Sequence, residues 1–140
     1  MTDSPDHSAI EPVLVTAGEH LSVLDQLQRR EPVFHHPEFG TTRDDFAAMM
    51  DDAFWEIGAS GRRYSREYIL DVLEQRGLDP PQDHWETRDF HCAEIAAGNF
   101  LLTYTLTHAG RVTRRASIWR SDGRGGWKIV FHQGTVVACE

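Results

Sequence analysis

The stretch that decides the fold covers residues 100–137 and reads FLLTYTLTHAG, RVTRRASIWRSDGRGG and WKIVFHQGTVV. Three runs of β-branched and aromatic residues are separated by a short turn at Ala109 and Gly110 and by a glycine-rich turn over residues 121–126. Runs of this composition, joined by short turns, are typical of an antiparallel meander. Residues 85–97 form a fourth run of the same kind, and turn residues follow it. The sequence therefore predicts four antiparallel strands in succession.

Three helical patterns precede these strands. Thr16 and Glu19 have the spacing of a capping box, and Thr42 and Asp45 repeat that spacing. Ser65 is a suitable cap for a third helix. The apolar faces predicted to be buried are Leu21, Leu24 and Leu27 in the first helix, Phe46, Met49 and Met50 in the second, and Tyr68, Ile69, Val72 and Leu73 in the third.

The predicted order of elements is α, α, β, α, β, β, β, β, with residues 54–61 (FWEIGASG) as the first strand. Because the helical patterns lie upstream of the meander, we expect one sheet to curl around the helices. A sheet that curls in this way is expected to enclose a pocket.

Length and composition limit the number of domains and the classes of partner. A chain of 140 residues with 40% hydrophobic and 26% charged residues is expected to form one core. The net charge of −8 argues against binding to nucleic-acid phosphates. No apolar run reaches membrane-spanning length, and the first residues lack the pattern of a signal peptide. We expect a cytoplasmic protein with a loose tail over residues 1–15, a single domain over residues 16–140, and no membrane or nucleic-acid partner.

The cysteine and histidine residues indicate neither a disulfide framework nor a metal site. Cys92 and Cys139 are expected to be reduced thiols, since Cys139 is the penultimate residue and a bridge would fix only a tail. His35 and His36 are adjacent, so in an extended segment they point in opposite directions. No HExxH, CxxC or facial-triad spacing is present. We predict no metal ion, and no motif indicates a cofactor.

Four segments carry a resemblance to a known superfamily: REPVFHHPE (30–38), FWEIGASG (54–61), RRASIWR (114–120) and WKIVFHQGT (127–135). With the order of elements, they resemble an uncharacterised branch of the nuclear transport factor 2-like superfamily, also called SnoaL-like or ketosteroid-isomerase-like. The resemblance implies an α+β cone-shaped roll, in which a strongly bent mixed or antiparallel sheet wraps around three N-terminal helices. Its members include isomerases, dehydratases, epoxide hydrolases, transport factors and oligomerisation modules, so it implies no single activity.

The turn at residues 109–110 fixes the register of the first hairpin of the meander. If it is a two-residue turn, Tyr104 lies opposite Arg115, and Leu102 lies opposite Ser117. Trp119 then lies on the same face of the sheet as these four residues. We expect this face to be the concave one, which lines the pocket.

The last strand has two possible registers. One places Phe131 and Gln133 on the concave face together with Trp127 and Ile129, and a slip of one residue places His132 there instead. We prefer the first register, because it keeps the bulkier apolar set on the helix side. The predicted ligand-binding residues are Glu56, Tyr104, Arg115, Ser117, Trp119, Phe131 and Gln133.

Two side chains are candidates for chemistry. Ketosteroid-isomerase relatives use a carboxylate base with an acidic hydrogen-bond donor, and Glu56 and Tyr104 match these roles by chemical type only. Glu56 is also the expected partner of a buried Arg115, and that pair has the alternative role of tying the first strand to the sheet. His132 is expected on the convex face, where its protonation below about pH 6.5 would loosen a dimer.

These features leave two classes of function. The first is a small-molecule-pocket protein, which binds a ligand or carries out a lyase, isomerase or hydrolase reaction. The second is a non-catalytic homodimerisation or protein-interaction module whose pocket is plugged by aromatic side chains. A homodimer is expected in which two outer sheet faces meet. The outer-face residues predicted for that contact are Thr103, Thr105, Ala116, Ile118, Val130 and His132.

Overall fold

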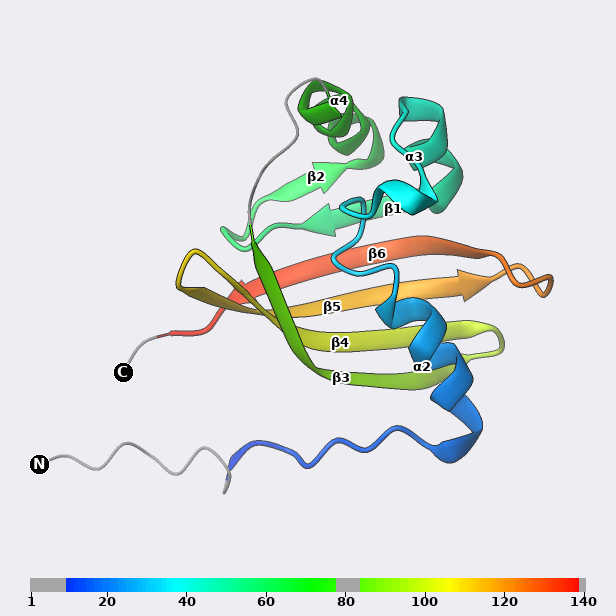
Figure 1. Ribbon diagram of the computed structural model, residues 1–140, viewed down its shortest axis with the longest axis vertical. Helices are drawn as coiled ribbons and strands as arrows, with labels where there is room; N and C mark the ends of the chain where they lie inside the picture. The colour runs from blue at the N-terminus through cyan, green and yellow to red at the C-terminus, as the bar shows by residue number, and fades with distance from the viewer. Residues whose placement is uncertain (1–9, 78–83, 139–140) are drawn as a thin grey trace, which may run out of the picture.

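The protein, described here from a computed structural model over residues 10–77 and 84–138, folds as helices packed on one six-stranded sheet (Figure 1). The strand order is β2-β1-β6-β5-β4-β3, and the β1–β6 pair is parallel while the other neighbours are antiparallel. The helices are η1 (Gly18–His20), α2 (Leu21–Gln28), η2 (Pro37–Phe39), α3 (Arg43–Met49) and α4 (Arg66–Gly77). The strands are β1 (Met50–Ile57), β2 (Arg63–Ser65), β3 (Trp85–Ala96), β4 (Asn99–His108), β5 (Arg111–Ser121) and β6 (Trp127–Val136).

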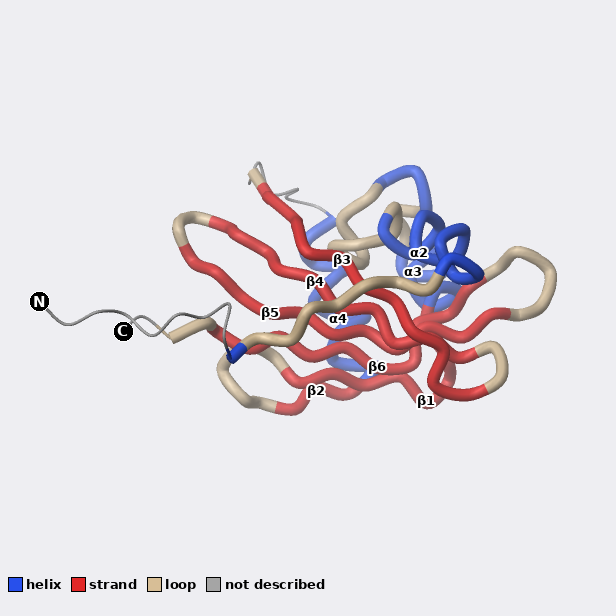
Figure 2. Tube along the Cα trace, turned by 90° about the horizontal axis from the view of Figure 1, so that it is seen from below, coloured by secondary structure: helices blue, strands red, loops and turns tan. Residues whose placement is uncertain are grey.

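Seen from below, α2 and α3 lie on one side of the sheet, and α4 lies behind the strands (Figure 2). Helix α2 packs against β3, α3 against β1 and β6, and α4 against β1 and β2. The core between the layers includes Leu27, Phe46, Met50, Leu102 and Ile129. The predicted α+β roll, with a mixed sheet that is not closed, is therefore confirmed.

The capping predictions have different outcomes. The capping box of Thr42 and Asp45 is formed at the start of α3. The one predicted for Thr16 is not formed, because the Thr16 hydroxyl instead accepts a hydrogen bond from the Cys92 backbone N–H of edge strand β3, at 3.1 Å. Ser65 accepts from the Tyr68 backbone N–H at 3.1 Å, as expected of a cap of α4.

Of the ten residues of the predicted apolar faces, five are buried, two are half-buried and three, in two helices, are exposed. Leu21 in the first helix is 55% exposed. In α4 the face is turned relative to the prediction, because Leu70 is buried while Tyr68 and Val72 are 51% and 42% exposed. The loop that leads from α2 to α3 contributes the rest of this core, with Phe34 packed edge-on against Phe46 at 5.9 Å.

The β4–β5 hairpin has the predicted turn and register. Ala109 and Gly110 both have positive φ, +52° and +77°, as a two-residue turn between twisted strands requires. Tyr104 lies opposite Arg115, and Leu102 lies opposite Ser117. The concave face of these two strands is therefore the predicted one.

Strand β6 departs from the preferred register. Trp119 pairs with Ile129, but Ile118 pairs with Phe131, so a β-bulge at Val130 adds one residue to β6. The extra residue reverses the alternation of side chains along the rest of the strand. Beyond it, His132 pairs with the concave residue Ser117.

The prediction that Phe131 and Gln133 line the concave face is therefore wrong, and so is the convex position predicted for His132. His132 is buried at 4% exposure. Gly134, the next concave position, lies opposite Arg115, and a Cβ there would stand 3.2 Å from the guanidinium carbon. The absence of a side chain at Gly134 makes room for Arg115.

Candidate functional site

A cavity of about 190 Å³ lies between the concave face of the sheet, helix α4 and the loop after α2. Its wall combines apolar side chains with polar and charged groups on two sides, a mixture that is common in small-molecule pockets. The residues that line it are Pro32, Val33, Phe34, His35, Glu56, Ile69, Val72, Leu73, Arg76, Trp85, Tyr104, Leu106, Arg115 and His132.

A buried carboxylate, Glu31, fixes the loop that forms one wall of this cavity. Its Oε1 accepts hydrogen bonds from the Tyr104 hydroxyl at 2.8 Å and from the Val33 backbone N–H at 3.0 Å. Its Oε2 accepts from the Trp119 indole N–H at 3.0 Å. Glu31 is 3% exposed, so these three donors replace water around a charged group. Burial and the Glu31 charge raise the pKa of Tyr104 well above its usual value.

Arg115 of β5 and His132 of β6 form one polar side of the cavity, and Ser117 of β5 contacts His132 from behind the wall. Ser117 Oγ and His132 Nδ1 are 2.7 Å apart, and both residues are buried. Arg115 donates from Nε to Thr113 Oγ1 at 2.9 Å, and its Nη1 lies 3.5 Å from His132 Nε2. Burial lowers the pKa of His132; the Glu31 charge opposes this change and the Arg115 charge adds to it. His132 is therefore neutral at pH 7.

Glu56 lies on the neighbouring strand β1, where it pairs with His132. Burial raises the pKa of its carboxyl to about 7, the Arg115 charge lowers it and the Glu31 charge raises it further. The predicted Glu56–Arg115 ion pair is not among the ion pairs of the described residues. Glu56 thus places a carboxyl that changes charge near neutral pH on the wall of the cavity.

Aromatic rings and a second arginine form the opposite side. The His35 ring lies 4.7 Å from the Trp85 ring, and Trp85 stacks on His108 at 4.2 Å. Arg76 of α4 donates to the Phe34 carbonyl oxygen and lies 3.3 Å from His35 Nε2. Burial, together with the Arg76 charge, lowers the pKa of His35 to about 4, so this histidine is also neutral.

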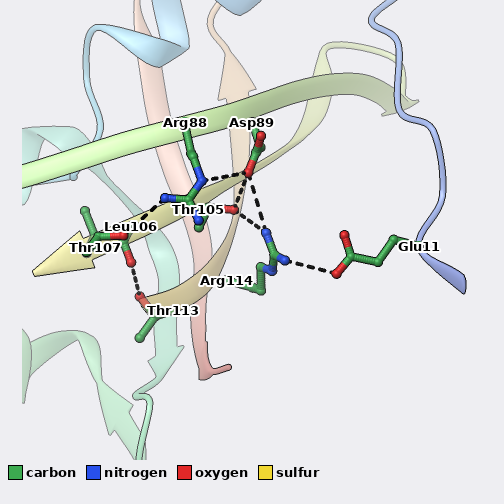
Figure 3. A network of polar contacts seen from close by, with 8 residues as sticks. All are labelled: Glu11, Arg88, Asp89, Thr105, Leu106, Thr107, Thr113 and Arg114. Atoms are coloured by element: carbon green, nitrogen blue, oxygen red, sulfur yellow. Dashed lines mark hydrogen bonds and ion pairs between the residues drawn. The ribbon is translucent and has the colours of Figure 1, made fainter. Parts of the chain in front are cut away.

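A wider groove of about 650 Å³ lies on the outer face, between the N-terminal segment and strands β3 to β6. Asp89 stands beside this groove at a bulge in β3, with a φ of +61°. It accepts a hydrogen bond from Thr105 Oγ1 at 2.9 Å and pairs with Arg114, which also pairs with Glu11 at 3.1 Å (Figure 3). These charged groups are already paired with one another, so the groove offers a ligand fewer available polar groups than the cavity does.

The structure brings together three of the seven predicted ligand-binding residues, since Glu56, Tyr104 and Arg115 all line the cavity. Ser117 and Trp119 lie on the concave face but are buried behind the wall. The other two lie on the outer face: Phe131 packs on Trp55 at 4.9 Å, and Gln133 lines the outer groove.

Sequence reasoning missed Glu31 and Arg76 as parts of this site, and it placed His132 there only in the register that was not preferred. A signal was present for Glu31, which lies between Leu27 and Val33 in a run that supplies core residues. An acidic residue in such a run must find donors if it is buried.

The described residues also bear on metal binding and on membrane crossing. Within residues 10–77 and 84–138, no three histidine, cysteine or acidic side chains are grouped so that they could hold a metal ion. No helix in the same residues is long and apolar enough to cross a membrane. Cys92 is a free thiol, while Cys139 lies outside the described residues, as do residues 1–9 of the predicted tail.

Solved structures show which fold this is. The chain is similar to an NTF2-like protein from Cytophaga hutchinsonii, with a TM-score of 0.63 and 12% identity over 86% of this chain and 100% of that one. It is also similar to a cystatin-like fold protein from Burkholderia xenovorans, with a TM-score of 0.63 and 14% identity over 87% and 97% of the two chains.

A third similar structure is a putative Ca/calmodulin-dependent kinase II association domain from Exiguobacterium sibiricum. Its TM-score is 0.57, with 19% identity over 91% of this chain and 100% of that one. No protein-family model and no curated protein matches the chain. At these identities the comparisons confirm the NTF2-like fold and leave the activity to be argued from the site.

Proposed function

We propose that the cavity binds a small carboxylic acid or a similar small carbonyl compound, with Arg115 as the anchor. The observation that carries this proposal is the position of Arg115. Arg115 lines the cavity and also borders the outer groove, and no ion pair joins it to a carboxylate of the described residues. A half-buried guanidinium favours an oxygen anion as its partner, because it carries several N–H donors and cannot lose its charge.

The other charges of the wall support an anionic ligand. Arg76 supplies a second positive charge at the cavity, and His35 and His132 add none. Below about pH 7 the carboxyl of Glu56 is protonated, so it adds no negative charge there. The cavity wall is then cationic.

The volume limits the size of the ligand. At about 190 Å³ the cavity is smaller than the roughly 300–1,000 Å³ of pockets for drug-sized ligands. It therefore fits a small metabolite and not a steroid. Glu56 remains the candidate for a general acid or base, while Tyr104 is better placed to shape the wall, since its hydroxyl hydrogen is already donated to Glu31.

We also propose a cytoplasmic location, in keeping with the free buried thiol of Cys92.

Calorimetric titration with butanoate tests this function. We expect binding to the unmodified protein, an at least tenfold loss of affinity in Arg115→Gln, and unchanged affinity in Arg114→Gln. Arg114 is a matched control, because it is the adjacent arginine on the opposite face of β5. Absence of binding to the unmodified protein at millimolar butanoate would contradict the proposal, as would equal losses in the two variants.

A second candidate function, homodimerisation, rests on an apolar row across the outer face. Trp55, Phe131, Ile118, Leu101 and Ala93 are successive register partners on β1, β6, β5, β4 and β3. Trp55 is 41% exposed although it is a large apolar ring. A second copy that contacts this row with its own would cover it symmetrically.

Sedimentation velocity tests the dimer. We expect a dimer at micromolar concentration, a monomer for Phe131→Glu, and a dimer for Lys128→Glu, which adds the same side chain at an exposed position of β6. A monomeric unmodified protein would remove this candidate and leave the ligand proposal unaffected.

A further inference from the structure

Ser117 fixes the position of the His132 ring. The hydroxyl and Nδ1 are 2.7 Å apart, and Ser117 is 0% exposed, so no water or ligand competes for this contact. The ring therefore presents its other nitrogen, Nε2, toward Arg115 and the cavity.

The partners of the ring also determine which nitrogen carries its proton. A guanidinium has donors and no acceptor, so the nitrogen that faces Arg115 must accept. Nε2 is consequently unprotonated, and in the neutral ring the proton is on Nδ1, which donates it to Ser117 Oγ. His132 thus offers a fixed acceptor at the cavity, next to a fixed cationic donor.

We propose that this pair selects a small 2-hydroxy carboxylic acid: Arg115 holds the carboxylate, and His132 Nε2 accepts the hydrogen of the adjacent hydroxyl. The proposal rests on the proposed function, since it specifies which small acid the same cavity prefers. Arg115 Nη1 and His132 Nε2 are 3.5 Å apart, so two ligand atoms that bind them must be near neighbours. A carboxylate oxygen and a hydroxyl oxygen on the next carbon meet that requirement.

Glu56 and His35 also place acceptor atoms on the wall, but within residues 10–77 and 84–138 neither is hydrogen-bonded to Arg115. The acceptor oxygens of Glu31 are occupied by Tyr104, Val33 and Trp119. His35 lies beside the second arginine, Arg76, on the other side of the cavity. The hydroxyl also replaces a weak contact, because Arg115 meets His132 only at the 3.5 Å limit of a hydrogen bond. Arg115 can turn to the carboxylate while the hydroxyl takes its place at Nε2.

Paired ligands test the inference. The affinities of 2-hydroxybutanoate and butanoate are measured by calorimetry for the unmodified protein, Ser117→Ala and His132→Phe. We expect the hydroxy acid to bind roughly three- to tenfold more tightly to the unmodified protein, the range of one net hydrogen bond. In His132→Phe the two affinities become equal while butanoate still binds, and in Ser117→Ala the preference is reduced.

Each result has a separate meaning. Equal affinities for the two acids in the unmodified protein would overturn the role of His132 and leave the proposed function intact, whereas failure of both acids to bind would overturn both. If His132→Phe does not fold, Ser117→Ala with the ¹⁵N shifts of the His132 ring decides. The hydroxy acid must shift the Nε2 resonance further than butanoate does, and equal shifts for the two acids would overturn the inference.

Discussion

Replacing the buried carboxylate of Glu31 is expected to destabilise the fold severely. Glu31→Gln keeps the shape of the side chain but turns one acceptor oxygen into an N–H donor. With the amide oxygen kept toward Tyr104 and Val33, the new N–H group faces the Trp119 indole N–H, which then has no acceptor. A buried donor without a partner costs about 1–3 kcal/mol, and more where the lost acceptor was charged.

We therefore expect Glu31→Gln to lower the free energy of unfolding by about 2–4 kcal/mol. The assay is urea denaturation followed by circular dichroism. Glu38→Gln is the matched control, since Glu38 lies in η2 of the same connection between α2 and α3 with its side chain 68% exposed, and it should change stability by less than about 0.5 kcal/mol.

A double-mutant cycle of Glu31→Gln and Trp119→Phe tests this explanation directly. Trp119→Phe removes the indole N–H, so in the Glu31→Gln background it removes the conflict between two donors. We expect the two changes together to cost at least about 1 kcal/mol less than the sum of the single changes. A Glu31→Gln effect as small as that of the control, or strictly additive effects in the cycle, would refute the account of the buried network.

Three further predictions concern separate parts of the chain. Thr42→Ala should cost about 1 kcal/mol in urea melts, because it removes the acceptor of the α3 capping box. Folding raises the pKa of Glu56 from 4.5 to about 7, so the folded state binds its proton more tightly and stability should fall as pH rises through that window. This fall in the free energy of unfolding should be less than about 3 kcal/mol, because solvent screens a partly exposed carboxylate. Glu56→Gln should remove the fall, and a variant whose melting temperature has the same pH profile as the unmodified protein would contradict this prediction. In a Cys139→Ser background, Cys92 should react with a thiol reagent far more slowly at pH 8 when folded than in urea, since burial raises its pKa to about 11; equal rates would contradict its burial.

The features that were predictable from the sequence are those decided locally. The two-residue turn at Ala109 and Gly110 depends on backbone preferences of two residues, and it fixes the pairing of Tyr104 with Arg115. The capping box of Thr42 likewise depends on residues three positions apart. Such interactions can be recognised in a single sequence because both partners lie within a few residues of each other.

The site itself was only partly predictable, because it depends on contacts between distant segments. Strict alternation along β6 fails at Val130, where the bulge places both Ile129 and His132 on the concave face. Glu31 is separated by 73 residues from Tyr104 and by 88 from Trp119, so no local pattern reveals that these groups meet. The sequence therefore predicted the wall carried by β4 and β5 and missed the wall that the loop after α2 adds.

The most direct test of the account is a ¹H–¹⁵N correlation spectrum recorded during titration with butanoate. Binding in the cavity predicts saturable shifts at residues that line it and do not line the outer groove, such as Phe34 and Leu73, with no change at Arg88 beside the outer groove. Shifts confined to Arg88 and Arg114, or no saturable shift at millimolar butanoate, would contradict the claim that Arg115 anchors a small acid in this cavity.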